Sequence, residues 1–89
     1  MLIDKYTIYK ETDEVDHLTI RVRKGEALDR ALAIKMIKRY TGTYPAVAAA
    51  LPGLDTSLPA LEAKDDRELY DLLIVIRTAL TDLVFGKQD

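Results

Sequence analysis

One cluster of side chains in the sequence has the chemistry of a metal site. Asp13, Glu14 and Asp16 are followed directly by His17. Carboxylate oxygens suit hard cations, and imidazole suits transition metals. However, the spacing matches no known calcium loop, and the glycine that such loops use for their sharp turn is missing. We therefore predict no metal site and interpret these residues as a solvated acidic turn.

The residue sets that usually carry catalysis are not found in the sequence. The chain has one histidine and no cysteine, and it contains neither a glycine-rich phosphate loop nor a nucleophile elbow. Asp65 and Asp66 are adjacent carboxylates, but acids at the start of a helix are explained by the helix dipole. We predict a protein that is not an enzyme and that uses no cofactor.

Residues 21–39 concentrate positive charge, with a local balance of +5 in a chain whose net charge is −2. This segment could neutralise the phosphates of a nucleic acid or orient another partner. Tyr9 is expected on the same outer face as Arg21, where its ring could stack on bases. The isoelectric point near 5.3 argues against nucleic acid. The candidate basic residues are Arg21, Arg23, Lys35, Lys38 and Arg39.

The strongest pattern in the chain indicates a helix of about 20 residues over 66–85. Asp65 and Glu68 can form a capping box at its start, and Gly86 can end it. Charged residues interrupt the segment, so we expect it not to span a membrane. Its apolar stripe, at the spacing of one helix face, consists of Leu69, Leu72, Leu73, Ile76, Leu80 and Leu83.

Three large side chains of this helix, Tyr70, Ile74 and Phe85, lie away from the leucine stripe. A group of exposed apolar residues along one edge suggests a covered surface. Either residues 43–64 of the same chain cover them, or a partner does. They are therefore candidate partner-binding residues, together with Tyr9 and the basic residues.

Two strands are expected at the N-terminus, over 2–10 and 17–23. The first contains aromatic and β-branched residues, which suit a pleated surface. In the second, Leu18, Ile20 and Val22 alternate with polar residues, as in a strand with one buried face. Joined by the acidic turn, they would form an antiparallel hairpin over 2–23.

The middle of the chain predicts further helices. Residues 26–40 are good helix formers, but their apolar side changes near Ala33, so this helix either bends or touches two neighbours. Residues 43–64 are too apolar for a solvated linker and favour short helical pieces. Pro45 suits the first turn of one piece over 46–51, and Ser57 could cap another.

Together these patterns predict a single small α+β domain, in which the hairpin packs on two main helices and one or two short ones. The function we expect is a small protein-interaction module in the cytoplasm. It would be an inhibitor, adaptor or subunit, for example of a bacterial or phage system. Its partner would be another protein or a second copy of itself. Two alternatives stay open: a nucleic-acid-binding accessory protein that uses residues 21–39, and a structural homodimer whose hairpins pair.

Overall fold

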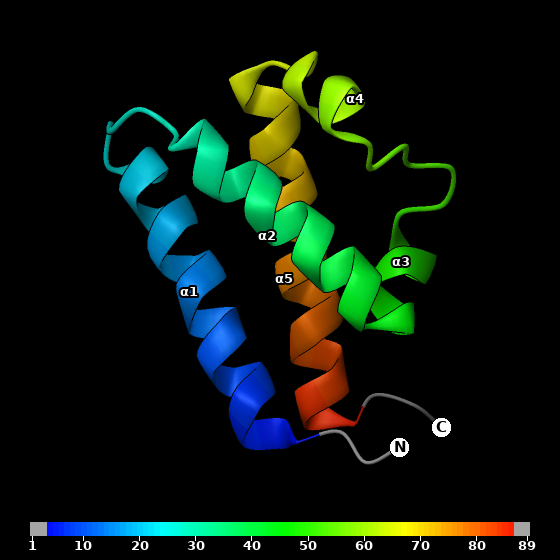
Figure 1. Cartoon of the computed structure of the whole chain (residues 1–89). Coiled ribbons are helices and arrows are strands. Elements are labelled where there is room, and N and C mark those ends of the chain that lie inside the picture. The colour runs from blue at the N-terminus through cyan, green and yellow to red at the C-terminus, as the bar shows by residue number, and fades with distance from the viewer. Residues whose placement is uncertain (1–3, 87–89) are drawn as a thin grey trace.

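The computed structural model describes residues 4–86, and Figure 1 shows a bundle of helices. The helix α5 packs against α1, α2 and α3, so it is the central element. In Figure 1, α1 and α5 run side by side in opposite directions, and α2 crosses α5 on its way to α3. The helices are α1 (Lys5–Arg23), α2 (Arg30–Thr43), α3 (Pro45–Ala50), α4 (Leu58–Glu62) and α5 (Asp66–Phe85).

The predicted hairpin is wrong, and the α+β class is wrong with it. Residues 5–10 of the first expected strand, the acidic turn and the second expected strand all belong to the single helix α1, whereas positions 2 and 3 lie outside the described residues. No residue of the described range 4–86 lies in a strand. Ile8, Val15 and Leu18 are buried on one side of α1, at spacings that fit a helix face. The protein is therefore all-helical over the described residues.

Two features hide this helical pattern in the sequence. Glu11 and Thr19 occupy buried positions of α1, where apolar residues would have marked the stripe. Ile20 is 39% exposed, so it completes a false strand-like alternation with its neighbours. Both buried polar groups are satisfied: the Tyr44 hydroxyl donates to Glu11, and the Thr19 hydroxyl donates to a backbone carbonyl 3.1 Å away. These contacts make a helix possible where the apolar pattern alone does not indicate one.

The long helix is confirmed as predicted, from its cap to its end. The Asp65 carboxylate accepts from the backbone N–H of Glu68 at 2.8 Å, and the Glu68 carboxylate accepts from that of Asp65 at 2.9 Å. Gly86 then takes a left-handed conformation, with φ of 64°, which favours glycine. Four leucine-stripe residues are fully buried: Leu69, Leu73, Ile76 and Leu80.

The middle helices differ from the prediction mainly at their boundaries. The predicted helix 26–40 begins at Arg30 instead, because the Asp29 carboxylate caps it by accepting from the backbone N–H of Leu32 at 3.1 Å. It packs on α5, α3 and α4, which fits a helix with more than one neighbour. Pro45 begins α3 as predicted, whereas the side chain of Ser57 makes no capping hydrogen bond at α4. Among the helices of residues 4–86, none combines the length and apolar character that a membrane crossing requires.

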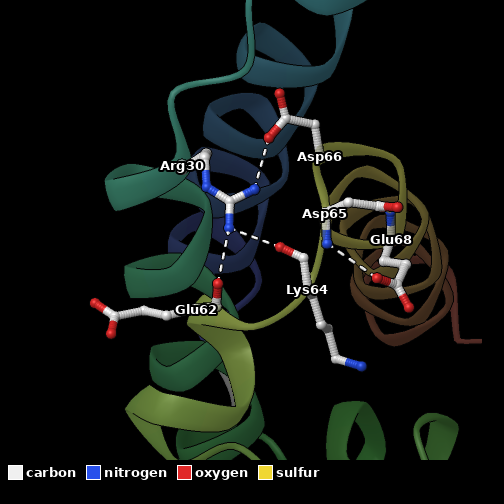
Figure 2. Close-up of polar contacts among 6 residues, drawn as sticks. All are labelled: Arg30, Glu62, Lys64, Asp65, Asp66 and Glu68. Atoms are coloured by element: carbon white, nitrogen blue, oxygen red, sulfur yellow. Dashed lines mark hydrogen bonds and ion pairs between the residues drawn. The ribbon is translucent and has the colours of Figure 1, made fainter.

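Arg30 fixes the start of α2 to the connection between α4 and α5, as Figure 2 shows. Its guanidinium donates to the Asp66 carboxylate at 2.6 Å. It also donates to the backbone carbonyls of Glu62 and Lys64, at 3.1 and 2.6 Å. One planar group thus joins three helices by a fork of donors that a lysine ammonium cannot reproduce.

Replacement of Arg30 by lysine should therefore lower the free energy of unfolding by about 1–2 kcal/mol, because hydrogen bonds from a charged donor are lost. Urea unfolding followed by circular dichroism measures this change. Arg67→Lys is the matched control, since the Arg67–Asp71 pair is largely exposed and such pairs contribute less than about 1 kcal/mol. Equal unfolding midpoints for Arg30→Lys and the parent chain would contradict a stabilising role for the fork.

Candidate functional site

A groove with a volume of about 410 Å³ lies between α1 and α2. Each helix contributes residues at positions i, i+3, i+4 and i+7, which is the spacing of one helix face. We call it the α1/α2 groove. The residues from α1 are Glu14, His17, Leu18 and Arg21, and those from α2 are Leu32, Lys35, Met36, Arg39 and Tyr40.

The floor of the α1/α2 groove is apolar. Leu18, Met36 and Tyr40 line it and are 4%, 6% and 1% exposed. Leu32 also lines the groove and is 37% exposed, so it offers apolar surface nearer to solvent. A side chain entering the groove would meet hydrocarbon at its base, where apolar contact is favourable.

The walls of the groove carry an excess of positive charge. Arg21, Lys35 and Arg39 line it, and Glu14 is the one carboxylate among its described lining residues. All three cationic side chains are exposed. Glu14 is already engaged, since its carboxylate accepts from the Tyr40 hydroxyl at 3.1 Å. The groove therefore has exposed cations on its walls and an apolar floor.

Two tyrosines of the α2 side connect it to α1. The Tyr40 hydroxyl donates to Glu14, and the Tyr44 hydroxyl donates to the buried Glu11. Burial, with help from the hydrogen bond to Glu11, raises the pKa of Tyr44 to about 12. Burial, followed by the charge of Glu14, also raises the pKa of Tyr40. Both hydroxyls consequently stay protonated and keep donating at neutral pH.

The structure brings together only part of the predicted basic group. Arg21, Lys35 and Arg39 share the α1/α2 groove. Lys38 lies outside it, and its ammonium donates to the carbonyl of Thr56 at 2.9 Å. Arg23 lines a different groove. The five cations are close in the sequence, but three of them, Arg21, Lys35 and Arg39, share one surface.

The three large side chains of the long helix lie in three different surroundings. Tyr70 lines the same groove as Arg23, which is separate from the α1/α2 groove. Ile74 is half-buried and lines a third groove, of about 550 Å³, with alanines of α3. Ile74 therefore faces a groove whose other side is formed by α3, within residues 43–64. Phe85 is 65% exposed and its ring meets that of Tyr9 edge-on, with centroids 6.2 Å apart.

The predicted nearness of Tyr9 to Arg21 is wrong. Both residues belong to α1, where twelve positions separate them along one helix. At about 1.5 Å per residue this separation is roughly 18 Å. A base stacked on Tyr9 would therefore not share a phosphate site with Arg21. The expected proximity of Tyr9 and Arg21 depended on the predicted hairpin, which was wrong.

Two of the three acidic residues considered as metal ligands have other partners. The Asp16 carboxylate accepts from Arg77 of α5, and Glu14 accepts from Tyr40. Across residues 4–86, the structure gathers no group of three or more potential ligand side chains. In α1, Glu14 and His17 line the α1/α2 groove, whereas the Asp16 carboxylate contacts Arg77 of α5.

No model of a known protein family matches the chain, and the comparisons with curated proteins and with solved structures also give no match. The surface of the chain itself therefore carries the functional inference.

Sequence reasoning missed the floor of the α1/α2 groove and the role of His17 in its lining. The signal was present: Glu14, His17, Leu18 and Arg21 follow the spacing of a helix face. Treating 17–23 as a strand placed Leu18 and His17 on opposite sides, which hid this face. The described lining residues form a groove with exposed cations and an apolar floor, and they include no serine, threonine or cysteine nucleophile.

Proposed function

We propose that this chain is a small, non-catalytic protein-interaction module that binds a segment of a partner protein in the α1/α2 groove. The observation that carries this proposal is the buried apolar floor beneath three exposed cations. Protein interfaces favour this arrangement, in which an apolar anchor fills a pocket and polar groups surround it. Bound in this way, the chain would serve as an inhibitor, adaptor or subunit.

The hydrogen bonds beneath the groove support a preformed binding surface. Tyr40 and Tyr44 fix α2 to α1 through the carboxylates of Glu14, which is exposed, and Glu11, which is buried. A surface that already has its bound shape loses less conformational entropy on binding. A cytoplasmic location is also part of the proposal, because a chain without cysteine suits a reducing compartment.

The other two functions are less well supported. Pairing of hairpins between two copies has no structural basis, because residues 4–23 contain no strand. Nucleic-acid binding loses the stacking surface near Arg21, since Tyr9 lies far along α1. An apolar floor also offers nothing to a sugar–phosphate backbone.

Photo-crosslinking tests the proposed function. A photoreactive phenylalanine analogue is placed at Leu32 in the groove or at Val75 on α5, two positions that are both 37% exposed. After irradiation in lysate of the source cell, we expect a protein adduct of one defined mass from position 32 and none from position 75. The adduct should disappear when Lys35→Glu is combined with the probe at position 32. Adducts from position 75 alone, equal adducts from both positions, or none would contradict the proposal.

A further inference from the structure

We propose that the occupant of the α1/α2 groove is an acidic amphipathic helix of about two turns. Its apolar side chains would contact Leu18, Met36 and Leu32, and its carboxylates would pair with the cations of the walls. This inference rests on the proposed function and adds the chemistry of the partner. Recognition of an amphipathic helix in an apolar groove is a common mode of peptide binding.

The dimensions of the groove set the length of its occupant. On α1 the lining runs from Glu14 to Arg21, and on α2 it runs from Leu32 to Tyr40. At about 1.5 Å per residue these stretches are roughly 10 and 12 Å long. Two turns of helix span about 11 Å. The groove thus matches a short helical segment.

The charge of the walls sets the charge of the occupant. Arg21, Lys35 and Arg39 face the groove with one lining carboxylate, Glu14, which already accepts from Tyr40. A partner with several carboxylates would gain favourable pairing there, whereas a basic partner would meet repulsion. Electrostatic complementarity therefore selects an acidic segment.

The three cations are available for such pairing. Arg21 pairs with Glu26 at 2.9 Å, but both side chains are more than half exposed. Arg39 lies 3.7 Å from Glu11, and its side chain is 61% exposed. Lys35 forms no ion pair with any residue of the described range 4–86. Exposed pairs contribute little to stability, so carboxylates of a partner can replace them.

A nucleic acid fits the same groove less well. Single strands bind to surfaces where cations alternate with exposed aromatic rings. The tyrosine of this groove, Tyr40, is only 1% exposed, so its ring offers no face for stacking, and the exposed His17 supplies only the smaller imidazole ring. The three cations also border the apolar floor of the groove. An acidic helix uses both the cations and the apolar floor of the groove, whereas an oligonucleotide leaves the apolar floor unused.

Isothermal titration calorimetry of the full chain with designed peptides tests the inference. The probe is a capped peptide of about 14 residues, long enough for partial helix formation. It carries leucine at positions i, i+3, i+4 and i+7, glutamate beside the leucine face, and alanine elsewhere. One control peptide has lysine in place of every glutamate, and another has glutamine in place of every leucine. An oligothymidine of about 12 nucleotides probes nucleic-acid binding.

We expect the acidic peptide alone to bind, with an affinity that falls as salt is raised. Lys35→Glu should weaken this binding at least about tenfold, because it replaces attraction by repulsion at the wall. Lys5→Glu is the matched control: Lys5 is exposed in the first turn of α1 and does not line the groove. It makes the same charge change and should alter the affinity by less than about twofold.

Several outcomes would overturn the inference. They are equal binding of the acidic and lysine peptides, equal losses from Lys35→Glu and Lys5→Glu, or binding of the oligonucleotide without the acidic peptide. A dimer in light scattering that blocks the peptide would assign the groove to a second copy. If position 32 gives its adduct but the peptide does not bind, the proposed function stands and the acidic helix is wrong. If position 32 gives no adduct and the acidic peptide does not bind, the groove is not a protein-binding site.

Discussion

Replacement of Leu73 by alanine is expected to lower the free energy of unfolding by about 3 kcal/mol. Leu73 is fully buried in α5, the helix that packs against three others. Alanine removes buried apolar atoms and leaves a cavity that the surrounding helices fill only in part. Because domains of this size have total stabilities of roughly 5–15 kcal/mol, the loss is a large fraction.

Urea unfolding followed by far-ultraviolet circular dichroism measures the loss. Val75→Ala is the control, because Val75 lies two residues further along the same helix and is 37% exposed. It should change the free energy of unfolding by less than about 1 kcal/mol, since partly exposed positions leave little cavity. Similar losses for the two variants would show that the leucine stripe is not the core.

The free energy of unfolding is also expected to fall steeply as pH rises above 10. The pKa of Tyr44 is raised to about 12 in the folded state, compared with about 10 in an unfolded chain. Below pH 10 both states hold the proton, and the stabilisation is fully present. Between pH 10 and 12 the unfolded state loses the proton while the folded state keeps it. Unfolding becomes easier by roughly 1 kcal/mol per pH unit for this tyrosine.

Tyr40 should contribute in the same direction, because burial raises its pKa as well. Other groups titrate at alkaline pH, so the measurement is the difference between variants. Urea unfolding from pH 9 to 12 should give a smaller slope for Tyr44→Phe than for the parent chain, by roughly 1 kcal/mol per pH unit. Tyr6→Phe, at a side chain that is 70% exposed, should retain the slope of the parent chain. The same slope in Tyr44→Phe would refute the proposed burial of its hydroxyl.

The sequence predicted α5 completely because every local signal agrees there. A long apolar period, a capping box of Asp65 and Glu68, and a terminal Gly86 all indicate the same boundaries. It failed at α1 because the buried side of that helix includes Glu11 and Thr19. Their partners come from tertiary contacts and a helical carbonyl, which a linear pattern does not reveal.

The candidate site was predictable only in part. Arg21, Lys35 and Arg39 were identified because they belong to a visibly basic segment. Their meeting in one groove depends on the angle between α1 and α2 and on two tyrosine hydrogen bonds. The apolar floor of the groove could be predicted only if α1 was recognised as a helix. In a helix, Leu18 shares a face with the cation Arg21.

The packing of α1 on α5 joins two helices that lie far apart in the sequence. Asp16 and Arg77, which join these helices, are 61 positions apart in the sequence. During synthesis α1 emerges first, but Ile8, Val15 and Leu18 cannot be buried against α5 until that last helix has formed. One wall of the α1/α2 groove therefore reaches its final position only after α5 has been synthesised. A nascent chain therefore contains the residues that line the groove before the groove itself has formed.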